Sequence, residues 1–253
     1  MAVLHLPALP GAPGLNSGAH LPVAEIARAA AEDARLIAEC GFTAVLVENF
    51  HDAPFLPGAV EPETVAALAV ITRAVVEAVE IPVGVNVLRN DALAALGVAV
   101  AAGASFLRVN VLCGAAVTDQ GLVQGNAHHL IRRRRALGAD VAILADVDVK
   151  HATSLDTRPL EHRARDLVTR GGADAVLVTG HATGQPADES ALRTVREAVA
   201  PCATLVASGT TEESLPALLR ASDGVIVGTC LKDPDTGRVD PERAAALVQR
   251  SRS

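Results

Sequence analysis

Three ionisable residues, Asp146, Asp148 and Lys150, occupy every second position of one apolar segment. Side chains two positions apart in a β-strand point to the same face, so this spacing predicts one charged face. Together with Glu48, the two aspartates could bind a divalent metal ion (Mg, Mn or Zn) through carboxylate oxygens. A desolvated Lys150 could instead form a Schiff base with a carbonyl substrate. A third interpretation gives these charges only electrostatic or proton-transfer roles, and the sequence requires no cofactor.

The same alternation predicts inward polar side chains on other strands. Arg108 and Asn110 are suited to orient an oxyanion or a hydroxyl group, so we add them to the catalytic candidates. The alternative is a network of salt bridges that fixes the core, because an unpaired buried charge is costly. His181 is a further candidate for proton transfer. The remaining substrate-binding candidates are His5, Asn86, His151, Thr179 and Ser208.

Two short segments combine glycine with threonine, Gly209-Thr210 and Gly228-Thr229. Glycine lets backbone amides approach an anion closely, and barrel enzymes often bind phosphate in the loops after strands seven and eight. We therefore predict that Gly209, Thr210, Gly228 and Thr229 bind a phosphate group. Thr210 with Glu213 could instead form a capping box for the next helix, but this interpretation does not explain Gly228-Thr229.

Eight apolar segments alternate with eight amphipathic ones along the chain. Strict alternation predicts parallel strands with helical crossovers, and eight units without a break favour a closed (β/α)8 barrel. We expect one TIM-barrel domain over residues 1–253, with a parallel eight-stranded sheet and outer helices. An open doubly wound sheet is the alternative, but the first strand lacks a glycine-rich phosphate turn. The predicted strands are Val3–Leu6, Gly41–Asn49, Ile81–Val87, Gly103–Asn110, Asp140–Asp148, Gly172–Thr179, Cys202–Gly209 and Ser222–Thr229. The predicted helices are 22–39, 61–79, 91–102, 124–137, 159–170, 188–199, 211–221 and 240–250, and the long loops are 7–22, 49–58 and 112–123.

Composition limits the partners that this chain could bind. The formal net charge of −7 and the absence of Trp and Tyr disfavour nucleic acid. The four cysteines form no CxxC pair, which indicates neither a disulfide framework nor a zinc site and favours the cytoplasm. The longest run without charged residues or His, Ala92–Leu107, is shorter than the roughly 20 residues of a spanning helix, so we expect no integral membrane segment. Barrels of this size often form homo-oligomers, and we expect one here.

Several motifs together resemble the BtpA family. The matching segments are 5–11, 47–55, 84–90, 108–110, 118–121, 146–152, 178–180 and 227–229, which include Arg108-Val-Asn110 and Asp146-Val-Asp-Val-Lys-His-Ala152. The resemblance implies a barrel similar to the ribulose-phosphate-binding group, which is consistent with a phosphate site. The family is named for a protein needed for photosystem I biogenesis and stability, and it also includes SgcQ. This likeness supplies no reaction.

These observations lead to three functional hypotheses. The first is an enzyme that acts on a small phosphorylated, sugar-like metabolite as an isomerase or aldolase-type lyase. The second is a non-catalytic biogenesis or stability factor that associates peripherally with a membrane complex. The third is a metal-dependent hydrolase that uses Glu48, Asp146 and Asp148.

Overall fold

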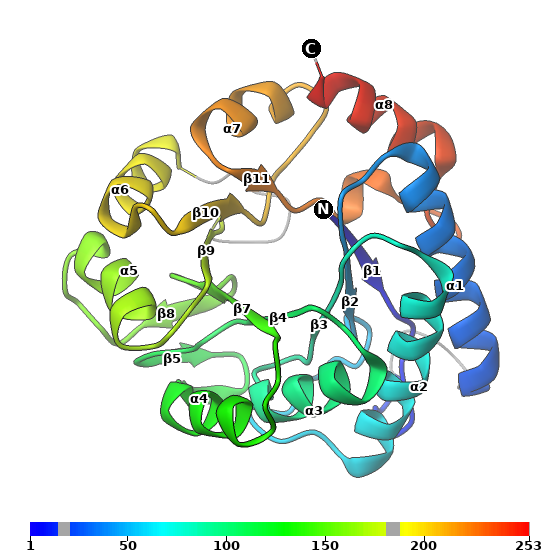
Figure 1. The fold of residues 1–253 in the computed structure, drawn as a ribbon, viewed down its shortest axis with the longest axis horizontal. Coiled ribbons are helices and arrows are strands. Elements are labelled where there is room, and N and C mark those ends of the chain that lie inside the picture. Colours follow the sequence, from blue (N-terminus) through cyan, green and yellow to red (C-terminus); the bar gives the residue numbers. More distant parts are fainter. Residues whose placement is uncertain (15–20, 181–187, 253) are drawn as a thin grey trace.

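Eight parallel strands form a ring that is surrounded by helices (Figure 1). The structure is a computed structural model that describes residues 1–14, 21–180 and 188–252. Neighbouring strands follow one another around the ring in the order β1-β2-β3-β4-β7-β9-β10-β11. The ring strands are β1 (Ala2–His5), β2 (Val45–Glu48), β3 (Val83–Asn86), β4 (Phe106–Val109), β7 (Ala142–Asp146), β9 (Ala175–Val178), β10 (Ala203–Val206) and β11 (Gly224–Val225).

The ring closes between its first strand and the segment that follows β11. Ala2 and Val227 form a parallel bridge. The amide of Val3 donates to the carbonyl of Val227 (2.8 Å), and the amide of Val227 donates to the carbonyl of Met1 (3.0 Å). The predicted parallel TIM-barrel fold is therefore confirmed, and the carboxyl ends of all eight strands share one face.

One helix follows each ring strand, as the alternation predicts. Glycines at Gly41 and Gly103 adopt left-handed conformations and end the first and third helices. The predicted start of the seventh helix at 211 is too early, because residues Thr211 and Ser214 hydrogen-bond to each other in a turn. The helices are α1 (Val23–Cys40), α2 (Pro62–Ala78), α3 (Ala92–Ala102), α4 (Ala127–Ala136), α5 (Leu160–Thr169), α6 (Glu189–Val199), α7 (Leu215–Ala221) and α8 (Pro241–Ser251), with a short 3-10 helix η1 (Thr229–Leu231).

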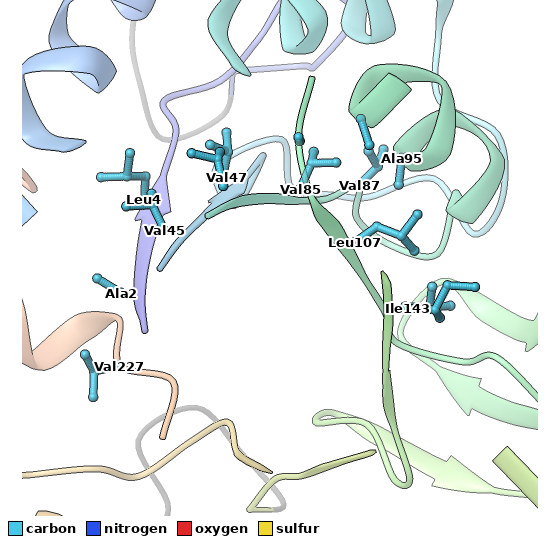
Figure 2. Packing of buried hydrophobic residues seen from close by; sticks show 14 of the residues in the cluster. Ala2, Leu4, Val45, Val47, Val85, Val87, Ala95, Leu107, Ile143 and Val227 are labelled. Atoms are coloured by element: carbon cyan, nitrogen blue, oxygen red, sulfur yellow. The ribbon is translucent and has the colours of Figure 1, made fainter. Parts of the chain in front are cut away.

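The apolar core lies on both sides of the ring. Figure 2 shows side chains such as Val47, Leu107 and Ile143, which belong to the buried cluster between strands and helices. A second cluster fills the inside of the ring, where the Phe106 ring lies over Gly84. This inner cluster supports the mouth of the barrel from below, because the polar residues follow it toward the carboxyl ends of the strands.

A small antiparallel sheet, which the sequence analysis did not predict, is built from segments that follow β4 and β7. Its strands are β5 (Ala115–Thr118), β6 (Gly121–Gln124) and β8 (Ala152–Ser154), in the order β6-β5-β8. The predicted loop 112–123 is therefore mostly a hairpin. Within the part of the chain that the structure describes, no helix has both the length and the apolar character to cross a bilayer.

Candidate functional site

A cavity of about 490 Å³ lies at the mouth of the barrel, where the ring strands end. This volume is in the range of about 300–1,000 Å³ that is typical of small-molecule sites. Eleven of the fifteen predicted site residues line it: His5, Glu48, Arg108, Asn110, Lys150, His151, Ser208, Gly209, Thr210, Gly228 and Thr229. The predicted convergence of residues from distant parts of the chain is thus present in the geometry.

Asp146 lies directly beneath the cavity and fixes two of its lining residues. Arg108 donates from Nε and Nη2 to the two carboxylate oxygens of Asp146, each at 3.1 Å. Asn110 donates its Nδ2 to the same carboxylate at 2.8 Å, which leaves its buried Oδ1 without a partner among the described residues. The Asp146 side chain is 0% exposed and that of Arg108 is 6% exposed. The pair is therefore buried and doubly hydrogen-bonded, and Asn110 presents an acceptor that no described residue uses.

Glu48 and its neighbours form a second polar group on β1, β2 and β3. Asn86 donates to Glu48 at 2.9 Å, and the Nε2 of His5 lies 3.8 Å from the other carboxylate oxygen. The His5 ring stacks on Phe50 with centroids 4.1 Å apart. Burial, and then the nearby charge of Lys232, lowers the pKa of His5 to about 2, so this imidazole is neutral at physiological pH. Asn86 itself is buried and positions Glu48 rather than facing the cavity.

The chain contains only two lysines, Lys150 and Lys232, and both lie near this site. Burial lowers the pKa of Lys150, and the charge of Arg108 lowers it further. Burial also lowers the pKa of Lys232 to about 8, with Glu48 opposing that shift. A lysine whose charged form is disfavoured supplies more of the neutral amine near neutral pH, which is the nucleophilic and proton-accepting form.

The two glycine-threonine segments face the same cavity from β10 and β11. The backbone amides of Gly209, Thr210, Gly228 and Thr229 have no hydrogen-bond acceptor among the described residues. The buried hydroxyl of Thr210 likewise has no partner there, so the predicted capping role of Thr210 is wrong. Thr211 makes the local bonds to Glu213 and Ser214 instead. Donors of this kind can bind an anion.

Two predicted site residues, Asp148 and Thr179, do not line the cavity. For Asp148 the reason is that strand β7 ends at Asp146. Beyond that point the alternation of faces no longer applies, and Asp148 pairs with Arg163 of α5. The hydroxyl of Thr179 donates to the backbone carbonyl of Asp148 at 2.9 Å and thereby supports this loop. The inward orientation predicted for Asp148 is therefore not observed.

The three carboxylates suggested as metal ligands do not come together. Asp146 is bound by Arg108 and Asn110, and Asp148 lies in another ion pair. Within residues 1–14, 21–180 and 188–252, no group of three His, Cys, Asp or Glu side chains could share a metal ion. The arrangement thus does not fit the metal-dependent hydrolase.

Among the described residues, two histidines besides His5 line the cavity. His151 lines the cavity and has a positive φ of 53°, a conformation that is uncommon for residues other than glycine. His51 also lines the cavity, and burial lowers its pKa. The predicted proton-transfer candidate His181 lies outside the described residues.

The sequence analysis missed Arg89, a cavity-lining residue three positions after the end of β3. Its Nη2 donates to the backbone carbonyl of Lys150, so it connects the loops after β3 and β7. Next to it, Asn90 exchanges hydrogen bonds with the backbone of Val111 at 2.8 and 2.9 Å and holds the start of the β5–β6 hairpin. Both residues belong to the 84–90 segment. The signal that could have identified Arg89 was a charged residue shortly after an apolar strand.

Comparisons with known proteins agree with this architecture. An uncharacterized protein of Thermococcus kodakarensis is 45% identical over 253 residues, covering 98% of this chain and 93% of that protein. The Photosystem I biogenesis protein BtpA of Synechocystis sp. is 43% identical over 222 residues, covering 87% and 77%. The structure of N-(5'-phosphoribosyl)anthranilate isomerase from Pyrococcus furiosus superposes with a TM-score of 0.57 at 17% identity, covering 87% and 93%.

The low identity of the superposed isomerase shows a shared fold and nothing more. The sequence relatives carry more weight, because they are similar over nearly the full length of this chain. The model of the BtpA family matches residues 1–253. This chain belongs to the BtpA family.

Proposed function

We propose that this protein is an enzyme that acts on a small phosphorylated, sugar-like metabolite, as an isomerase or an aldolase-type lyase. The observation that carries the proposal is one cavity with free anion donors on one side and buried ionisable groups on the other. Buried charged groups lower stability unless they are paired or take part in binding or catalysis. A non-catalytic scaffold would have no need for such groups at the open mouth of the barrel. The isomerase that shares this fold has, by its name, a phosphoribosyl substrate, which agrees with the proposal.

The phosphate would lie between the loops after β10 and β11. Four amides and the Thr210 hydroxyl, which have no partners within the described ranges, supply five donors. Gly228 allows this approach, because a Cβ atom there would meet the His5 ring at 3.3 Å. Backbone donors fixed before binding need no rearrangement, which favours affinity for an anion.

The reacting part of the substrate would lie over Arg108, Glu48 and Lys150. Arg108, held by Asp146, can stabilise negative charge that develops on a carbonyl oxygen. Glu48, held by Asn86, can accept a proton from a carbon next to that carbonyl. Lys150 can return the proton, as required for an isomerase, or add to the carbonyl carbon as a neutral amine with loss of water, as required for a Schiff-base lyase.

Ligand binding tests the phosphate part of the proposal. We expect inorganic phosphate and C3–C6 sugar phosphates to raise the melting temperature, whereas the unphosphorylated sugars do not. Thr210→Val should weaken phosphate binding by roughly fivefold to tenfold, because one hydrogen bond to a charged group is lost. Thr194→Val, on the outer helix α6, is the matched control and should bind normally. The absence of any effect of phosphorylated ligands would contradict this proposal.

Activity assays and borohydride trapping of a Schiff base test the proposed chemistry. We expect Lys150→Met to abolish conversion of any sugar phosphate that the wild type turns over. Reduction with borohydride during turnover should attach substrate to Lys150 if a Schiff base forms, and mass spectrometry can assign it readily because only two lysines exist. Turnover without an adduct would favour the isomerase, and normal turnover by Lys150→Met would refute the role of this lysine.

A further inference from the structure

Arg89 is a buried cation that makes no ion pair with any residue that the structure describes. Only 8% of this residue is exposed, and its Nε has no hydrogen-bond partner among the described residues. Its Nη2 donates to a backbone carbonyl, which is uncharged. Asp119, in the β5–β6 turn, acts on it electrostatically, as do Asp146 and Glu48 more weakly, but none of the three makes an ion pair with it. Because a buried guanidinium is costly without an anion, a ligand has to supply that charge.

The charges of the mouth support the same conclusion. Three cations line the cavity, Arg89, Arg108 and Lys150, and Lys232 lies close enough to act on Glu48. Two carboxylates, Glu48 on the cavity wall and Asp146 beneath it, oppose these cations. The cations therefore outnumber these carboxylates. Lys150, like Arg89, makes no ion pair within the described part of the chain. Part of the excess is therefore located at Arg89, whose side chain is hydrogen-bonded to the loop that carries Lys150.

The order of strands sets Arg89 apart from the phosphate loops. In the eight-strand ring, β3 is four strands from β10 and three strands from β11 (Figure 1). Arg89 therefore lies across the mouth from these loops, whereas Lys150, which follows β7, is only two strands from β10. Arg89 follows β3, whereas the glycine-threonine segments follow β10 and β11. A ligand that uses both Arg89 and these segments must span the mouth and be anionic at both ends.

We infer that Arg89 forms a second anion subsite, and that the substrate is a phosphorylated hydroxy or keto acid whose carboxylate binds there. This inference rests on the proposed function, because the other end is the proposed phosphate site. A carboxylate carries one negative charge, which matches the one charge of the Arg89 guanidinium, and its two oxygens suit the paired donors of that group. The unused Oδ1 of Asn110 fits a hydroxyl group between the two ends.

Three small molecules separate the two subsites. These are 3-phosphoglycerate, which has both anions and a hydroxyl, glycerol 3-phosphate, which lacks the carboxylate, and glycerate, which lacks the phosphate. Isothermal titration with the intact wild-type protein should show 3-phosphoglycerate binding at least about tenfold more tightly than glycerol 3-phosphate, because charge-assisted hydrogen bonds are added. Equal affinity of these two would overturn the second subsite and leave the phosphate site standing.

Failure of the proposed phosphate site would give a different result. If glycerate binds as tightly as 3-phosphoglycerate, the second subsite is supported and the proposed phosphate site is wrong. If none of the three binds, both are overturned. These comparisons need no variant, so they do not depend on whether an altered protein folds.

Variants then assign the residues. Arg89→Gln should remove the tenfold preference for 3-phosphoglycerate while the affinity for glycerol 3-phosphate stays unchanged. Arg73→Gln, which removes an exposed arginine paired with Glu77 on α2, should keep the preference. A loss of affinity for both phosphorylated ligands by the same factor in Arg89→Gln would indicate a merely structural role and overturn the assignment.

Discussion

The guanidinium of Arg108 and the carboxylate of Asp146 are almost completely removed from water, and each satisfies the other. Removing one partner of such a pair leaves an uncompensated buried charge, which typically costs about 3–5 kcal/mol. We predict that Asp146→Asn, which keeps the shape of the side chain, lowers the free energy of unfolding by about 3 kcal/mol. Urea unfolding followed by circular dichroism measures this change.

An exposed pair provides the control for that experiment. Glu77 and Arg73 pair on the surface of α2, where both side chains are more than half exposed. Surface pairs contribute about 0–1 kcal/mol, so Glu77→Gln should change stability little. Comparable losses in Asp146→Asn and Glu77→Gln would show that the buried pair is not a special feature of the mouth.

Lys232 gives the stability of the protein a pH dependence of known sign. Burial lowers its pKa from 10.5 to about 8, so the folded state disfavours the charged amine. Below about pH 8 this lysine is charged in both states, so the full cost of burying its charge destabilises the folded state. Between pH 8 and 10.5 the unfolded state binds more protons than the folded state, so this cost is lost and stability rises. The cost is on the order of 3 kcal/mol.

We therefore predict that Lys232→Met is more stable than the wild type at pH 7, and that this advantage shrinks toward zero by about pH 10.5. Urea unfolding of both proteins at several pH values between 7 and 10.5 measures it. The comparison between the two proteins is essential, because burial raises the pKa of Cys113 and Cys230, which gives the opposite slope in both. A difference that does not change with pH would contradict the prediction.

At the scale of elements, the inside of the ring depends on a glycine in β3. A Cβ atom at Gly84 would lie 2.1 Å from the ring of Phe106 in the neighbouring strand β4. Overpacking a core typically costs about 1–3 kcal/mol, so we predict that Gly84→Ala destabilises the protein by about 2 kcal/mol or more. A smaller residue at 106 should relieve the clash.

A double-mutant cycle checks this explanation. Gly84→Ala should cost much less in the presence of Phe106→Leu than in the wild type, when both are measured by thermal or urea unfolding. If the two substitutions are additive, the contact between these positions is not the cause of the loss.

The ring strands could be predicted from the sequence, because each one is a short apolar segment with alternating faces, a purely local signal. The small sheet could not. Its β5 and β6 combine exposed and buried residues without a clear period, and β5 pairs with β8, which lies more than 30 residues further along the chain. Asp148 was misplaced for a related reason, because the sequence does not show that β7 ends at Asp146.

At the scale of the whole molecule, the position of the site followed from topology more than from any single motif. Parallel strands in a ring bring their carboxyl ends to one face, so polar residues near those ends had to converge. The choice of partners could not be predicted in the same way. Asp146 binds Arg108 and Asn110, while Arg89 makes no ion pair among the described residues. Both outcomes depend on loop paths and side-chain packing that only the assembled barrel defines.

Because the two proposed subsites lie on opposite sides of the ring, their occupation should be visible across the whole mouth. We predict that saturating 3-phosphoglycerate slows amide hydrogen exchange in the loops after β3, β7, β10 and β11 together. A ligand at about 100 times its dissociation constant stabilises the folded state by about 2.7 kcal/mol, which corresponds to roughly 100-fold slower exchange for amides that need ligand release to open.

Glycerol 3-phosphate serves as the control ligand in the same measurement by mass spectrometry. It should protect the loops after β10 and β11 and leave the Arg89 loop unprotected, because it has no group for that side. If both ligands protect the Arg89 loop, the phosphate group alone is sufficient for that protection. Protection confined to β10 and β11 with 3-phosphoglycerate would show that the ligand does not span the ring, so the free charge at Arg89 would need a different partner.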